Sequence, residues 1–167
     1  MRHQPFYCEE NVFWLVQEPA LSAGDPHAVF ITNADRRCCF FEQRASPPGQ
    51  PTWWDYHVIA TAHGDAWDLD SRLETPVPLR AYLDATFRLP DPRLRFRAVP
   101  VAELLSTFTT DRSHMRAADG RYLQLPPPWA PPTAAGHEMN LSAFLDLTGD
   151  APGRVLDQAG FLDTFSG

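Results

Sequence analysis

The chain of 167 residues carries a formal net charge of −7, which argues against a nucleic-acid groove or an anionic membrane surface as its main partner. Hydrophobic residues make up 44% of the chain and aromatic residues 12%, a balance that argues against disorder along its whole length. No apolar run approaches the ~20 residues that a membrane helix needs. The length suits one domain with one sizeable core, and we expect residues 1–167 to form it.

The helix expected nearest the N-terminus begins at or near Cys8. Acidic residues in its first turn suit the helix dipole, and apolar residues recur behind them at helical spacing. These residues are Glu9, Glu10, Val12, Leu15 and Val16. The ten residues at the start of the chain contain no apolar signal-peptide core, which indicates a cytoplasmic location.

Two short strands are expected next, over residues 28–32 and 38–41. The second contains Cys38 and Cys39, which point to opposite faces of a strand and are therefore not expected to share a metal. With Cys8 the chain has three cysteines, an odd number that argues against a disulfide framework. In a reducing compartment they are free thiols, and one of them is then available for chemistry.

Residues 53–71 predict a β-hairpin. The segment from Tyr56 to Thr61 favours a strand, residues 62–65 favour a turn, and residues 66–70 favour the return strand. A two-residue turn at His63 and Gly64 places His57 opposite Asp70, with Asp68 diagonal to His57 on the same face. The hairpin thus predicts a His–Asp pair, but strand spacing alone does not choose between Asp68 and Asp70.

The second half of the chain mixes helices with one further strand. We expect helices beginning at Pro78, over residues 102–108, over 141–147 behind an Asn140 cap, and over 156–165, with a strand over 93–99. The Pro-rich residues 125–133 predict an extended surface segment that Trp129 anchors to the core. This order of elements favours an α+β fold over a doubly wound parallel sheet.

A His–Asp pair is what a thiol nucleophile needs. The imidazole takes the thiol proton and the carboxylate fixes the imidazole's tautomer. A helix N-terminus and a nearby imidazolium lower the pKa of a thiol, and Cys8 is predicted to have both. Taken singly, each residue has an ordinary structural alternative: an inert buried thiol for Cys8, a satisfied histidine for His57 and an edge carboxylate for Asp68.

Three blocks of sequence give the chain a resemblance to a known family. They are Tyr-Cys-Glu-Glu-Asn-Val at 7–12, Trp-Asp-Tyr-His-Val at 54–58 and Trp-Asp-Leu-Asp-Ser at 67–71, with further agreement at 28–31, 111–115, 126–128 and 139–141. The set resembles the protein N-terminal glutamine amidohydrolases, which convert an N-terminal Gln to Glu and release ammonia. The resemblance follows the chain in order over nearly its whole length.

The resemblance implies a single catalytic domain over 1–167, with an αβα sandwich fold and a mainly antiparallel sheet, related to transglutaminases and papain-like proteases. It implies Cys8 as nucleophile, His57 as base and Asp68 as the acid that orients the base, with no cofactor. The chain departs from the family pattern at Trp67, at the short hairpin tip 62–65, over 36–39 and near Pro47. These departures affect the loops and the breadth of substrates more than the chemistry.

Specificity for a terminal Gln requires an acid that holds the free α-ammonium group. The candidates are Glu9, Glu10, Asp55 and Asp70. Asp70 is preferred because it shares the hairpin face with His57, although a solvated acid is the alternative reading for each of the four. Trp54 is a candidate for the pocket wall, with burial in the core as its alternative.

A metal-dependent amidase using His57, His63, Asp68 and Asp70 is disfavoured, because His63 lies on the turn and no helical His pair supports it. Three functions remain: N-terminal glutamine deamidation through a thioester, a cysteine protease or transglutaminase-type acyl transfer with the same triad, and a non-catalytic adaptor that binds N-terminal segments. The expected partners are proteins or peptides with a free N-terminal Gln, and a monomer is expected for a domain of this size. His114 has no assigned chemistry at this point.

Overall fold

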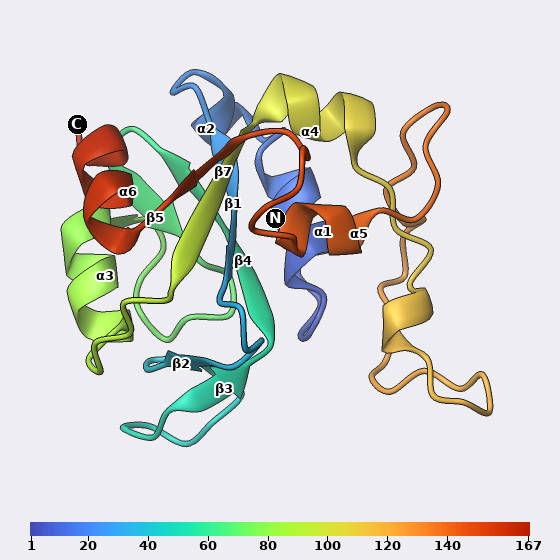
Figure 1. Ribbon diagram of the computed structural model, residues 1–167, viewed down its shortest axis with the longest axis horizontal. Coiled ribbons are helices and arrows are strands. Elements are labelled where there is room, and N and C mark those ends of the chain that lie inside the picture. The colour runs from blue at the N-terminus through green and yellow to red at the C-terminus, as the bar shows by residue number, and fades with distance from the viewer.

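A six-stranded antiparallel sheet runs through the middle of the computed structural model, which describes residues 1–167 (Figure 1). The strand order is β6-β5-β4-β1-β7-β8. The strands are β1 (His27–Thr32), β4 (Tyr56–Ala62), β5 (Asp65–Trp67), β6 (Val77–Pro78), β7 (Arg95–Pro100) and β8 (Arg154–Leu156). Because helices cover both faces of this sheet, the predicted α+β fold with a mainly antiparallel sheet is confirmed.

Alternation along β1 divides the core into two layers. Ala28 and Phe30 face one cluster of apolar side chains, whereas Val29 and Ile31 face the other. The first cluster joins the sheet to α1 (Cys8–Leu15), α2 (Pro19–Ser22), α4 (Val101–Thr107) and α5 (Leu141–Leu145). The second joins it to α3 (Leu79–Thr86) and α6 (Gln158–Phe165). Each large apolar side chain buried in this way stabilises the fold by about 1.5–3 kcal/mol, so β1 and its neighbour β4 are held on both faces.

A second, two-stranded sheet pairs β2 (Cys38–Phe40) with β3 (Thr52–Trp54). Cys38 is buried and Cys39 is half-buried, in agreement with their predicted orientation to opposite faces. The sequence did not predict β3, which follows a Pro-rich segment. This strand brings Trp54 next to the beginning of β4.

The hairpin between β4 and β5 has the predicted turn but a shorter return strand. His63 and Gly64 both have positive φ (57° and 82°), as a two-residue type I′ turn requires, and Ala62 pairs with Asp65. The ladder ends at Trp67, so the expectation that His57 lies opposite Asp70 is wrong. The strand stops there because a carboxylate oxygen of Asp68 accepts the backbone N–H of Asp70 at 3.0 Å, which turns the chain away from β4.

The helices and the strand predicted for the second half of the chain are present to within a few residues, whereas α2, β6, η1 (Ser113–Met115) and β8 were not predicted, and Leu156 ends β8 instead of beginning a helix. Asn140 precedes α5, but its side chain does not cap that helix. Its Oδ1 instead accepts the backbone N–H of Thr109, 2.9 Å away. The Pro-rich segment has no regular structure, and the indole of Trp129 anchors it by donating to Glu10. None of the helices has both the length and the apolar character needed to cross a bilayer.

Candidate active site

A cavity of 640 Å³ opens where the first turn of α1 faces the beginning of β4. It is bounded by α1, β4, the segment after β5, α5 and the 3₁₀ turn η1 (Ser113–Met115). The polar and aromatic residues of its wall used below are Cys8, Trp54, Tyr56, His57, Asp70 and His114. Five of the blocks that carry the sequence resemblance therefore meet at one cavity, although the first and the last lie in opposite halves of the chain.

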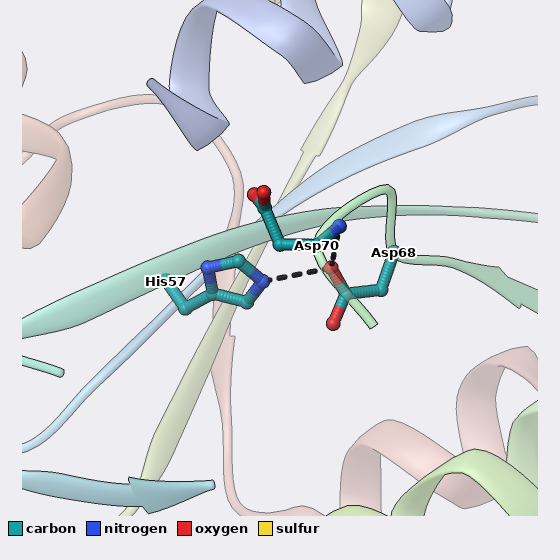
Figure 2. A group of neighbouring side chains, drawn as sticks. All are labelled: His57, Asp68 and Asp70. Carbon is teal, nitrogen blue, oxygen red and sulfur yellow. Dashed lines mark hydrogen bonds and ion pairs between the residues drawn. The ribbon is translucent and has the colours of Figure 1, made fainter. Parts of the chain in front are cut away.

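His57 and Asp68 form a buried pair beside this cavity, with 2.9 Å between Nε2 and Oδ1 (Figure 2). Asp68 also accepts hydrogen bonds at Oδ2 from the Gln43 amide (2.8 Å) and the Tyr82 hydroxyl (2.9 Å). Burial alone raises the pKa of Asp68, but the charge and hydrogen bond of His57, together with these two donors, outweigh it and leave the pKa lowered. The carboxylate is therefore ionised and fixed in orientation.

The ring of His57 is held in a defined plane. Trp54 stacks on it with 5.8 Å between ring centroids and an interplanar angle of 10°, and Phe40 contacts it edge-on at 5.4 Å. Burial lowers the pKa of His57. The opposing contributions, led by the charge and hydrogen bond of Asp68, outweigh burial, so the net pKa is raised. Because Nε2 faces the carboxylate, a neutral ring carries its proton there and presents Nδ1 as a base.

Cys8 is the first residue of α1, and its Sγ lies 3.6 Å from Oε2 of Glu9. Burial raises the pKa of this thiol well above its usual value, and the Glu9 carboxylate raises it further. The expectation that the helix start lowers the pKa of Cys8 is therefore wrong for the free protein, because removal from water and a neighbouring negative charge dominate. The thiol is protonated at rest and needs a base to become a nucleophile.

Asp70 lines the cavity with a side chain that is 13% exposed. Its carboxylate points away from the His57–Asp68 bond (Figure 2), and its Oδ1 lies 2.8 Å from Nε2 of His3. Potential ligand atoms of His57, Asp68 and Asp70 lie within 4.8 Å of one another. A metal is nevertheless a poor fit for this group, because the Asp68 carboxylate already accepts four hydrogen bonds.

The other acids predicted from the sequence lie in different surroundings. Glu9 is buried and does not line the cavity, and Glu10 forms a buried two-bond ion pair with Arg112, at 2.7 and 2.8 Å. Asp55 lines the cavity, but its Oδ1 accepts the backbone N–H of Tyr56. Of the four candidates, Asp70 is the one whose carboxylate meets the cavity without a backbone or arginine partner.

Sequence reasoning missed two residues that hold Asp68, Gln43 and Tyr82. Gln43 follows β2, and its Oε1 also accepts the Trp54 indole N–H at 3.3 Å. Gln43 therefore links Trp54, which stacks on His57, to Asp68, which is hydrogen-bonded to His57. The position of Tyr82 fits the apolar face of α3, and the sequence pattern does not indicate which group its hydroxyl binds. His63 lies on the hairpin turn and lines a different cavity, so the alternative metal set with His63 is not assembled.

A protonated thiol at a helix start and an imidazole backed by a carboxylate, all around one cavity, are the groups of thiol-dependent hydrolases and acyl transferases. The sequence model of the N-terminal glutamine amidase family matches residues 3–165, and the chain belongs to this family.

Curated relatives support the same assignment. The chain is 32% identical over 168 residues to protein N-terminal glutamine amidohydrolase of Arabidopsis thaliana, with 89% of this chain and 76% of the relative covered. It is 36% identical over 169 residues to the protein of that name from Oryza sativa subsp. indica, covering 89% of this chain and 73% of the relative. For the Homo sapiens protein of that name the identity is 30% over 155 residues, covering 84% and 76%.

Proposed function

We propose that this protein hydrolyses the side-chain amide of an N-terminal glutamine in proteins or peptides, giving glutamate and ammonia. The family assignment supports the reaction, since the matched relatives bear the name of that activity. The single structural observation that carries the mechanism is the buried 2.9 Å bond between His57 and Asp68 on the wall of the cavity that also contains Cys8.

In the proposed mechanism Cys8 is the nucleophile, His57 the base and Asp68 the orienting acid. The thiol proton moves to Nδ1 of His57 as Sγ attacks the carboxamide carbon of the substrate. The imidazolium then gives that proton to the departing nitrogen, ammonia leaves, and a thioester remains on Cys8. A water molecule gives a proton to His57 and attacks the thioester, which releases glutamate and returns the proton to the thiol.

The developing oxyanion needs a hydrogen-bond donor. Cys8 is the first residue of α1, where backbone N–H groups have no partner within the helix. The N–H of Cys8 is therefore the proposed donor to the oxyanion. The raised pKa of the Cys8 thiol fits a mechanism in which His57 deprotonates it only during attack, because a permanent thiolate is disfavoured beside Glu9.

Asp70 is the proposed partner of the substrate's α-ammonium group. Its largely buried carboxylate meets the cavity next to His57, and in a terminal Gln whose side-chain amide reacts there the α-ammonium is only a few bonds from that amide. A blocked or internal Gln that displaces His3 brings no cation and leaves the carboxylate without a partner, which costs about 1–3 kcal/mol. Trp54 is the proposed wall of the glutamine side-chain pocket.

The proposal extends to the whole chain and its setting. Residues 1–167 act as one catalytic domain with an αβα sandwich related to transglutaminases and papain-like proteases, and the enzyme acts as a cytoplasmic monomer without a cofactor. Gel filtration with light scattering tests the oligomeric state. Retained deamidation in the presence of a chelator tests the independence from metal.

The reaction is tested with three peptides of the same composition, one beginning with Gln, one beginning with Asn and one with an internal Gln. Ammonia release and the mass change of amide to acid are expected for the Gln-initiated peptide alone. Peptide cleavage, or amine incorporation without ammonia release, supports the protease or acyl transferase in place of the amidase. Full activity of Cys8→Ala contradicts every mechanism that uses the thiol, and binding without turnover supports an adaptor.

A further inference from the structure

Two adjacent acids of α1, Glu9 and Glu10, both contact the loop that contains η1, but with different partners. Glu10 pairs with Arg112, and Oε1 of Glu9 lies 3.1 Å from Nε2 of His114. We propose that His114 is a positioning residue for the Cys8 thiol and acts through the carboxylate of Glu9. This inference rests on the proposed role of Cys8 as nucleophile.

The Glu9 carboxylate is placed where its charge opposes formation of a thiolate. Its side chain has no exposed surface, and Oε2 is 3.6 Å from Sγ of Cys8. In such a water-free position a negative charge acts on its neighbour with little screening. After burial itself, Glu9 is the largest contributor to the raised pKa of the Cys8 thiol.

Only a histidine is available to compensate this charge. No arginine nitrogen lies within 4.0 Å of the Glu9 carboxylate, and the chain contains no lysine. The Tyr56 hydroxyl donates to Oε2 at 3.1 Å, but it is neutral, because burial and then Glu9 raise its pKa well above the usual value. His114 lies next to both groups, 3.4 Å from the Tyr56 oxygen, and as an imidazolium it neutralises Glu9.

The ion pair of Glu10 and Arg112 holds the loop that places His114 next to Glu9. Arg112 is buried, makes two hydrogen bonds to Glu10 and donates to the backbone carbonyl of Trp129 at 2.7 Å. Its backbone is left-handed, with φ of 62°, and η1 begins at the next residue. The arginine is permanently charged, so the loop stays anchored and holds the 21% exposed His114 beside Glu9.

Other charged groups near the thiol already have partners. The carboxylates that face Cys8 besides Glu9 are Asp68 and Asp70, which pair with His57 and His3. Asp111 lies close to His114, on its own loop. The pH dependence of the thiol therefore includes contributions from three imidazoles, and substitutions are needed to isolate that of His114.

The test measures the reactivity of Cys8 directly, with no substrate present. The rate of alkylation by iodoacetamide is followed across the pH range by mass spectrometry of the peptide that contains Cys8, which separates it from Cys38 and Cys39. His114→Gln removes the cation and leaves Glu9 charged. We expect alkylation about tenfold slower near neutral pH, which corresponds to a midpoint raised by about one pH unit.

Glu9→Gln removes the charge that His114 compensates. The double variant of Glu9→Gln with His114→Gln should react at a rate close to that of the unmodified protein, and the single variant Glu9→Gln should react at least as fast, because it loses the carboxylate that opposes the thiolate. His114→Asn is a second uncharged variant and must slow alkylation as His114→Gln does. His137→Gln replaces an exposed histidine elsewhere and serves as the matched control, and thermal unfolding of each variant checks that it is folded.

An unchanged alkylation profile in both His114 variants overturns the inference. Slow alkylation that persists when Glu9 is also replaced overturns it as well, because the effect would then bypass the carboxylate. Failure of the proposed function has a different signature: the unmodified protein releases no ammonia from a Gln-initiated peptide, whatever the alkylation profile.

Discussion

Tyr82→Phe removes one hydroxyl group from the set of donors that hold Asp68. The hydroxyl is buried and donates to Oδ2 of the carboxylate at 2.9 Å. A hydrogen bond to a charged group contributes about 1.5–3 kcal/mol, so we expect the free energy of unfolding at neutral pH to fall by about that amount. Phe fills nearly the same space, which keeps the packing of α3 on the sheet and isolates the polar effect.

The loss of stability in Tyr82→Phe should depend on pH, in the direction set by the ionisation of Asp68. The pKa of Asp68 is lowered in the folded protein, so the stability that its charge contributes is fully present above the unfolded-state value and is lost as pH falls through the folded-state pKa. The penalty of Tyr82→Phe should therefore shrink in acid, toward the about 0.5–1.5 kcal/mol of a neutral hydrogen bond. The assay is urea unfolding of both proteins at neutral pH and at the lowest pH where both fold.

Tyr7→Phe is a matched control for the stability measurement. The Tyr7 hydroxyl is also attached to a buried ring, but it donates to the uncharged backbone carbonyl of Gln124, 3.1 Å away. Its loss should cost about 0.5–1.5 kcal/mol with no dependence on the ionisation of Asp68. A Tyr82→Phe penalty that is equal to this control, or that does not change with pH, refutes the reasoning that Asp68 is held as a carboxylate by charge-assisted bonds.

Two further predictions concern activity and a third concerns stability. Asp68→Asn should lower kcat by about four orders of magnitude with little change in KM, measured by ammonia release, because His57 loses the group that fixes its tautomer; a mild effect contradicts the assigned role. Asp70→Asn should raise KM for a Gln-initiated peptide about tenfold or more, and should reduce the ratio of kcat/KM between this peptide and its acetylated form. A fall in kcat alone contradicts the role of Asp70 in binding the α-ammonium group. Arg112→Lys cannot reproduce the two-bond pair with Glu10, so thermal unfolding should show a lower Tm, with His137→Gln unchanged.

Local patterns were sufficient for the elements that carry the reactive groups. The acidic first turn behind Cys8 and the His63-Gly64 turn are signals contained within a few residues, and both features formed as predicted. The point at which β5 ends was not predictable in the same way. It depends on whether the Asp68 carboxylate accepts a backbone N–H or extends the ladder, and the repeating strand pattern does not distinguish the two outcomes.

The residues around the reactive groups were harder to predict because their partners are distant in sequence. Gln43 reaches Asp68 from the far side of a Pro-rich segment, and Tyr82 occupies a position that satisfies the apolar pattern of α3 perfectly well without a polar partner. The contact between Glu9 and His114 spans most of the chain. No periodicity reports such pairs, since they depend on how separate elements pack.

Three histidine–carboxylate pairs lie around one thiol, and their exposure separates their functions. In the pair of His57 and Asp68 both side chains are buried, which suits a base that exchanges protons with the thiol, the substrate and the attacking water in the cavity and not with bulk solvent. His3 is 31% exposed, so it can leave Asp70 when a cation arrives. The α-ammonium of a substrate would then take the place of the imidazole beside the carboxylate, which keeps a partner throughout binding. A substrate without that cation offers no such exchange, which explains physically why a free N-terminus is required in the proposed reaction.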